Sequence, residues 1–215
     1  SIDLIFGAPG QTTTEWQCDL EQALTLAPDH ISLYGLTIEP GTPFAKQQAS
    51  GDLVLPVEDD HQAAMYDLAL QLTESAGLNQ YEISNFARPG FESRHNLSCW
   101  RGDTYVGVGL SAHSYDGSTR SWNVRSLNEY LNRMEEGQSP IEDSESIGEE
   151  TRSIERIMLG LRTRDGIDSH LVRSENAISR LVSENLIQRR GDRITLTRQG
   201  KVIADSVCEE LVRDV

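Results

Sequence analysis

The chain has few cysteines, no long apolar run and little positive charge over most of its length. Cys18, Cys99 and Cys208 lie far apart, which excludes a CxxC zinc or redox pair and favours reduced thiols over a disulfide framework. No stretch reaches about 18 consecutive apolar residues, so no transmembrane segment is expected. With 37% hydrophobic and 25% charged residues over 215 positions, the chain can still bury a core in one or two domains.

The first residues have neither the basic region nor the apolar region of a signal peptide. Together with the reduced cysteines, this predicts a cytoplasmic protein. The chain opens directly on Ile2–Phe6, which has the pattern of a buried strand. Because proteins rarely begin with a buried strand, we expect further sequence to precede Ser1.

Acidic residues are concentrated in the first 150 positions, which hold 7 Lys and Arg against 24 Asp and Glu. Residues 151–215 hold 12 against 10. An acidic body repels nucleic acid and anionic membrane at long range. No nucleic-acid partner is therefore expected, and any membrane contact would be peripheral.

Strands and helices alternate over the first 90 residues. The patterns predict strands at Ile2–Phe6, Ile31–Leu36 and Gln80–Ser84, with helices over 12–26 and 59–76 between them. Thr12 and Glu15 have the spacing of a capping box at the start of the first helix. This alternation predicts crossover connections and a parallel sheet, with the chemistry gathered at the carboxyl ends of the strands.

Residues 88–123 are rich in Gly, Arg, Asn, His and Trp, and predict a long functional loop with one strand around Tyr105–Val108. A helix is expected over Leu127–Glu136 and an acidic linker over 137–148. The pattern after Glu149 is helix, helix, hairpin at Gly191-Asp192, helix, which is winged-helix-like. DNA binding is disfavoured there, because the candidate recognition helix over 174–185 carries two acidic residues against one arginine.

Three segments could carry chemistry. In the first, Gly7 and Gly10 would let the backbone approach a ligand, with Gln11 beside them, and Asp3 could accept a hydrogen bond from a ribose hydroxyl. The alternative is a plain strand-to-helix turn, because a lone glycine-rich turn is a weak signal.

In the second segment, His95 stands among aromatic residues, with Arg94 and Arg101 nearby. Histidine ligates haem iron, and arginine pairs with propionates. The alternative is a structural histidine that holds a loop. In the third segment, Tyr105–Ser114, a strand of small residues followed by His113 could form a wall over an adenine ring, or could simply pack beneath a helix.

Several stretches in order resemble the HemW/HemN family of radical S-adenosylmethionine (SAM) proteins. Residues 3–12, DLIFGAPGQT, are similar to the family's DLIYGLPGQT. Residues 28–42 resemble its next strand and loop, 81–87 its YEISNFA stretch and 107–114 its GxGxGAHS stretch. The C-terminal region also resembles the family's last domain, so the likeness covers nearly the whole chain.

The resemblance implies an α/β fold: the C-terminal half of a partial (β/α)6 radical SAM (TIM-like) barrel over 1–140, carrying a haem-binding-type loop. A small helical winged-helix-like domain would follow over 141–215. The family's CxxxCxxC motif, which holds a [4Fe–4S] cluster for SAM cleavage, is expected upstream of Ser1. Three scattered cysteines do not replace it, so this chain alone is expected to run no radical chemistry.

The resemblance also implies site residues. Asp3, Gly10, Gln11, Thr37 and His113 are expected to bind SAM. The haem-chaperone branch carries HNxxY, which assigns His95 as the haem iron ligand with Asn96 beside it. Cys99 stands where that motif has tyrosine, so its thiolate could compete for iron. Arg94 and Arg101 are the expected propionate partners.

The expected function is that of a haem-binding chaperone that delivers haem to respiratory haemoproteins. Haem or porphyrin and a haemoprotein acceptor are its expected partners. The alternatives are an oxygen-independent coproporphyrinogen III oxidase and an inactive fragment that lacks the cluster motif.

Overall fold

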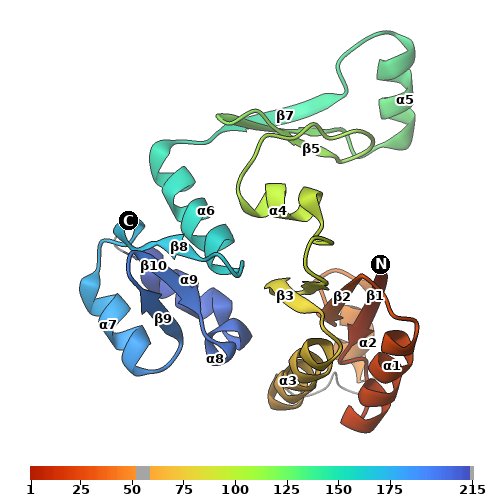
Figure 1. Ribbon diagram of the computed structural model, residues 1–215. Coiled ribbons are helices and arrows are strands. Elements are labelled where there is room, and N and C mark those ends of the chain that lie inside the picture. The colour runs from red at the N-terminus through yellow and green to blue at the C-terminus, as the bar shows by residue number, and fades with distance from the viewer. Residues whose placement is uncertain (52–58, 214–215) are drawn as a thin grey trace. The chain divides into compact units, whose positions relative to one another are not determined.

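The computed structural model describes residues 1–51 and 59–213, and these form two compact units, Ser1–Glu92 and Ser93–Val215 (Figure 1). The first unit is a four-stranded sheet in the order β1-β2-β4-β3. Its elements are β1 (Ile2–Phe6), α1 (Thr13–Thr25), β2 (His30–Gly35), α2 (Pro43–Ser50), α3 (Asp59–Ser75), β3 (Asn79–Glu82) and β4 (Asn85–Ala87).

One face of this sheet packs against α1 and α3. The predicted capping box is confirmed: Glu15 N donates to Thr12 Oγ1 at 3.2 Å, and Thr12 N donates back to Glu15 Oε2 at 2.8 Å. It sets the start of α1 so that Trp16 is fully buried, with its Nε1 donating to Met65 O at 2.9 Å. The core consists of Phe6, Trp16, Leu20, Ala23, Ile31, Leu33, Met65, Tyr66, Ala69, Leu78 and Phe86.

The prediction of a wholly parallel sheet is wrong for its third strand. β1 and β2 are parallel, but β2 pairs antiparallel with β4, which also pairs antiparallel with β3. The expected strand Gln80–Ser84 is instead a tight hairpin that turns at Ile83 and Ser84. The strand beside β2 is thus the returning arm of the hairpin, which reverses its direction.

The second unit holds two three-stranded sheets and most of the helices (Figure 1). Its elements are α4 (Arg94–Trp100), β5 (His113–Tyr115), β6 (Thr119–Asn123), α5 (Leu127–Glu135), β7 (Ile141–Ser146), α6 (Glu149–Leu161), β8 (Ile167–Asp168), the 3-10 turn η1 (Ser169–Leu171), α7 (Glu175–Ser183), β9 (Ile187–Arg190), β10 (Arg193–Leu196), α8 (Arg198–Val202) and α9 (Ala204–Val212).

Three predictions for this unit are wrong. The expected loop after residue 88 contains the helix α4, which Ser93 caps by accepting from Asn96 N. The expected strand Tyr105–Val108 is reduced to one bridge, Tyr105 to Tyr115. The expected acidic linker contains β7, which pairs with β6 across the predicted domain boundary at 140/141. The domain assignment itself stays a prediction.

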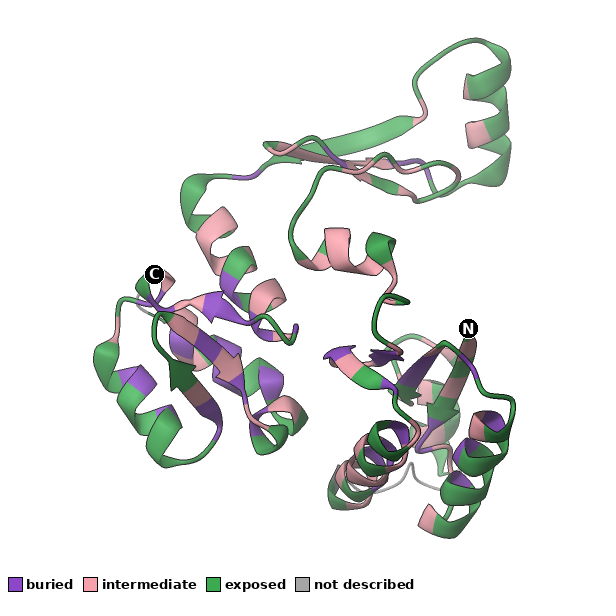
Figure 2. Cartoon of the chain, in the orientation of Figure 1, coloured by how far each residue is buried: buried purple, intermediate pink, exposed green. Residues whose placement is uncertain are grey.

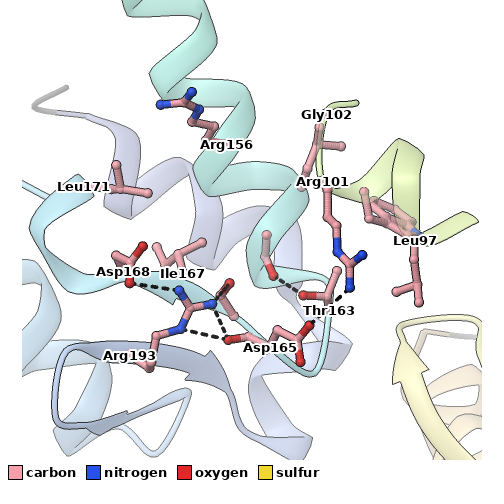
Figure 3. A pocket seen from close by; sticks show the side chains of 14 residues that line it. Leu97, Arg101, Gly102, Arg156, Thr163, Asp165, Ile167, Asp168, Leu171 and Arg193 are labelled. Atoms are coloured by element: carbon pink, nitrogen blue, oxygen red, sulfur yellow. Dashed lines mark hydrogen bonds and ion pairs between the residues drawn. The ribbon is translucent and has the colours of Figure 1, made fainter. Parts of the chain in front are cut away.

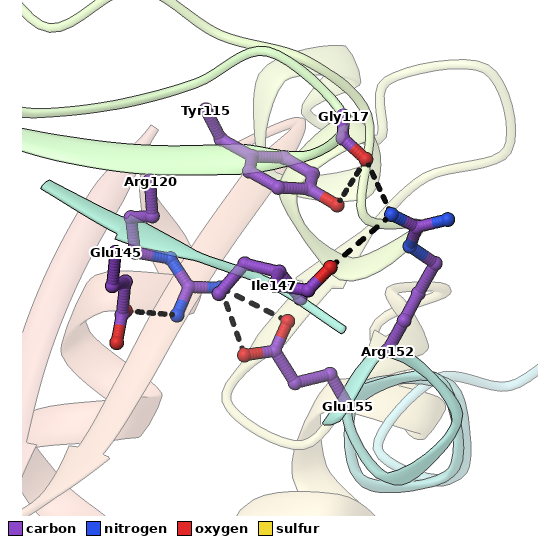
Figure 4. A network of polar contacts seen from close by, with 7 residues as sticks. All are labelled: Tyr115, Gly117, Arg120, Glu145, Ile147, Arg152 and Glu155. Carbon is purple, nitrogen blue, oxygen red and sulfur yellow. Dashed lines mark hydrogen bonds and ion pairs between the residues drawn. The ribbon is translucent and has the colours of Figure 1, made fainter. Parts of the chain in front are cut away.

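β7 was missed because its side chains are exposed along its whole length, so it shows no alternation of polar and apolar residues (Figure 2). Cross-strand partners hold it instead. Arg120 of β6 donates to Glu145 of β7 at 3.2 Å, and binds Glu155 of α6 through Nη2 at 2.8 and 2.9 Å (Figure 4). This network, which Arg152 extends by donating to Gly117 O at 3.0 Å, fixes the sheet to the start of α6.

The C-terminal part of the unit has its own buried core beneath β8, β10 and β9. The predicted hairpin is confirmed, with Arg193 opposite Arg190 and Leu196 opposite Ile187. Buried residues in α6, α7 and α9 pack together with these strands (Figure 2). The final predicted helix is split into α8 and α9.

Candidate functional site

The turn after β1 is built as the glycines suggested. Gly7 and Gly10 both have positive φ, +78° and +77°, which disfavours other residues. A side chain at Gly7 would also come within 2.6 Å of Gln62 Nε2. Gln11 was predicted to contact SAM, but its Oε1 accepts from Gly7 N at 2.8 Å. That oxygen therefore holds the turn, and Gly10 is the exposed position.

Thr37 lies just beyond the same end of the sheet. Phe6 and Gly35 are the last paired residues of β1 and β2, and Leu36 N donates to Phe6 O at 2.8 Å. The exposed Thr37 and the glycine turn therefore follow neighbouring strand ends. Gln62 of α3, which the sequence did not single out, joins them by donating to Leu36 O at 3.1 Å.

A row of polar residues crosses the sheet, and the sequence patterns did not reveal it. Asp3 pairs with Ser32, Ser32 with Asn85, and Asn85 with Glu82. Paired residues share a face, and Phe6, Ile31, Leu33 and Phe86 occupy the opposite, helix-covered face. Asp3 is exposed, whereas Ser32, Asn85 and Glu82 are buried. Asn85 Oδ1 is buried with no hydrogen-bond partner.

Glu82 is a buried carboxyl in this row, with 2% of its surface exposed. Burial raises its pKa, although hydrogen bonds from the Asn85 side chain and from backbone amides oppose the rise. An acid with a higher pKa in the folded state keeps its proton longer than the unfolded chain does. The contribution of Glu82 to folding stability is therefore lost as the pH rises above its pKa in the unfolded chain, about 4.5.

We accordingly expect the free energy of unfolding of Glu82→Gln, relative to that of the wild type, to increase as the pH rises above about 4.5. Urea unfolding of both proteins across a pH series measures the difference. Glu74→Gln, which removes an exposed carboxyl on α3, is the matched control. A stability difference for Glu82→Gln that stays constant with pH would contradict the expectation.

The predicted haem residues lie on or next to α4. His95 and Cys99 are exposed, four residues apart, with Nε2 and Sγ 3.9 Å from each other. At about 100° per residue, Arg94 lies about 100° and Arg101 about 120° around the helix axis from His95, both turned away from Cys99. Arg101 lines a cavity there, with Asp165 4.0 Å away (Figure 3). The roles of His95 as iron ligand and of Arg94 and Arg101 as propionate partners stay predictions.

His113 lies beside a second cavity of about 390 Å³, lined by Ser111, His113, Trp122, Asn123 and Arg125. The His113 and Trp122 rings are 5.7 Å apart and tilted by 33°. Gly107 is required next to β5, because any side chain there would collide with the His113 backbone. His113 belongs to the second unit and Asp3 and Thr37 to the first, so their shared SAM site stays a prediction.

The described residues, 1–51 and 59–213, contain no group of three or more His, Cys, Asp or Glu that could hold a metal ion. Cys18 and Cys99 are exposed in different units, and Cys208 is buried. The same described residues include no helix with the length and apolar character needed to cross a bilayer.

Known proteins resemble this chain along nearly its whole length. It is 35% identical over 217 residues to the haem chaperone HemW of Bacillus subtilis, and 35% identical over 214 residues to that of Mycobacterium tuberculosis. Those matches cover 96% and 99% of this chain. The chain belongs to the HemW/HemN family of radical SAM proteins. It spans 57% and 55% of these two relatives' lengths.

A mitochondrial radical SAM domain-containing protein 1 of Danio rerio is 49% identical over 113 residues, covering 53% of this chain and 25% of that protein. The solved coproporphyrinogen III oxidase HemN of Escherichia coli has the same α/β fold, with a TM-score of 0.75 at 19% identity over 99% of this chain and 54% of that one. No protein-family model matches the chain.

Proposed function

We propose that this HemW/HemN family member is a haem-binding chaperone of the HemW type, which passes haem to a haemoprotein acceptor in the cytoplasm. The observation that carries the proposal is the exposed His95 on α4, at the position of the histidine in the family's HNxxY pattern. Because the imidazole of His95 is exposed, a haem can reach it, and imidazole is a ligand of haem iron. Asn96 lies next to it in the same helix.

Cys99 gives this chain a second candidate iron ligand where the HNxxY pattern has tyrosine. Its Sγ lies 3.9 Å from His95 Nε2. Because both side chains lie on one side of one helix, either could bind the iron of a haem that approaches from that side. The side chain that does not bind the iron would then contact the one that does, and would influence its orientation and basicity.

We also propose a SAM site in this protein. Asp3 would accept from ribose hydroxyls, with Gly10 and Thr37 at the neighbouring strand ends and His113 with Trp122 as the aromatic wall for adenine. Gln11 would act indirectly, by shaping the turn that it caps. This site implies that the sheet of the first unit belongs to a partial (β/α)6 barrel over 1–140, followed by a winged-helix-like domain over 141–215.

The [4Fe–4S] cluster of radical SAM proteins does not fit the residues of this chain. Such a cluster needs thiolates that converge on one point, whereas Cys18 and Cys99 lie in separate units and Cys208 is buried. No radical step is therefore assigned to these residues. What remains for them is to bind and orient haem and SAM.

Titration of the purified chain with haem tests the proposal. We expect a shifted Soret band in the wild type, and a loss of haem affinity of about tenfold or more in His95→Ala, because the iron loses its imidazole. Cys99→Ser should change the position of the band if the thiolate contributes to ligation.

His170→Ala is the matched control, because His170 is also exposed in the second unit. It should bind haem as the wild type does. A wild-type protein that gives no Soret shift, or a His95→Ala variant that is indistinguishable from His170→Ala, would refute the chaperone assignment.

A further inference from the structure

The cavity on the other side of α4 has features that the proposed haem and SAM sites do not use. Its volume is about 300 Å³, and it lies where the end of α4 meets α6, β8 and β10. All of these elements belong to the second unit. In Figure 3, Arg156 extends from α6 above Leu171 and Asp168, while Arg101 descends from the end of α4 toward Asp165.

The lining carries more positive than negative charge, although the whole chain has a net charge of −15. Three arginines, Arg101, Arg156 and Arg193, face two aspartates, Asp165 and Asp168. A cavity with a local surplus of one sign attracts ligands of the opposite charge.

The three arginines differ in the hydrogen bonds and ion pairs that their guanidinium groups make. Arg193 is held by Asp168 at 2.9 Å and by the carbonyl oxygens of Asp165 and Gly166 at 2.6 and 2.7 Å, so it is part of the wall. Arg101 has only a 4.0 Å contact with Asp165. Within residues 1–51 and 59–213, Arg156 has neither a hydrogen bond nor an ion pair. Two guanidinium groups are therefore available to a ligand.

The rest of the wall is apolar. Leu97 and Trp100 of α4, Leu159 of α6 and Leu171 of η1 line the cavity and are all half-buried. Guanidinium groups bind carboxylates bidentately, and an indole ring offers a flat surface for stacking. At about 300 Å³, the cavity has room for the edge of a large planar molecule rather than for all of it.

We propose that this cavity is a second ligand site, which takes the carboxylate-bearing edge of a flat apolar molecule. Arg156 and Arg101 bind the carboxylates, and Trp100 and Leu97 contact the apolar body. The site lies across α4 from His95 and needs no metal in the ligand. It does not depend on the proposed haem ligation, and either assignment can fail while the other stands.

The test uses the whole chain and iron-free protoporphyrin IX, a planar dicarboxylate, followed by its fluorescence. We expect saturable binding by the wild type, and an affinity about tenfold lower for Arg156→Gln, because a charge-assisted pair is lost. The dimethyl ester of the same porphyrin, which has no charged carboxylate, should bind more weakly and should not distinguish the two proteins. Because the probe contains no iron, loss of an iron ligand cannot produce this pattern.

Arg190→Gln is the matched control. It removes one exposed arginine of β9 that does not line the cavity, so it changes the net charge equally and should bind as the wild type does. Far-UV circular dichroism of each variant checks that it is folded. Three outcomes would overturn the site: no binding to the wild type, equal losses in Arg156→Gln and Arg190→Gln, or an ester that binds as tightly as the free acid.

Discussion

Replacing Trp16 with alanine is expected to lower the free energy of unfolding by about 3–5 kcal/mol, the largest loss we expect from any single substitution proposed for this protein. The indole is fully buried between α1, α3 and the sheet. Its ring stands 5.2 Å from that of Phe6, and its Nε1 donates to Met65 O at 2.9 Å. Alanine would leave both a cavity and a lost hydrogen bond.

Urea unfolding followed by far-UV circular dichroism measures this loss as a lower midpoint. Cys18→Ala is the control, because Cys18 is exposed on the same helix two residues away, and it should stay within about 0.5 kcal/mol of the wild type. A loss below about 1 kcal/mol in Trp16→Ala would mean that α1 does not pack on the sheet as described. The glycine turn at the end of β1 would then lose its support.

Replacing Gly166 with alanine is expected to cause the second-largest loss in the free energy of unfolding. Gly166 lies between α6 and β8 with φ +62°, a conformation that costs other residues about 1–2 kcal/mol. An added Cβ would also collide with the backbone carbonyl of Ile194 in β10. Backbone cannot yield as a side-chain end can, so overpacking should add about 1–3 kcal/mol to the loss.

Gly191→Ala is a close match for this experiment. Gly191 has φ +59°, and no atom lies within 4 Å of the Cβ that alanine would add. It should therefore show the backbone strain alone, and the difference in unfolding free energy between the two variants isolates the collision. Gly166 also lines the cavity that contains Arg101 and Arg156, so Gly166→Ala should bind protoporphyrin IX less well. Equal destabilisation by both variants would argue against the close approach of β10.

Much of the first unit could be predicted from local patterns. The capping box at Thr12 and Glu15, the buried face of α1 and the strands β1 and β2 follow from hydrogen-bonding capacity and side-chain periodicity over a few residues. α2 was missed even though Thr42 caps it and Pro43 occupies its first turn. Those two residues are the signal that could have revealed it.

Two elements of the second unit could not be predicted from local patterns. α4 has seven residues, too few to be stable as an isolated helix, so it was taken for a loop. β7 has no buried face and is held by its pairing with β6, where Arg120 meets Glu145. For β7 the local sequence carries little preference, and pairing with another strand decides the structure.

The family, the residues of the glycine turn and the placement of Cys99 four positions after His95 all follow from the order of residues along the chain. Which residues come together depends on how the chain folds. The polar row from Asp3 to Glu82 exists because the register of three strand pairs aligns it. Arg101, which directly follows α4, and Arg156 of α6 line one cavity although they are 55 positions apart. Strand register and helix packing depend on contacts between distant parts of the chain, which no local pattern encodes.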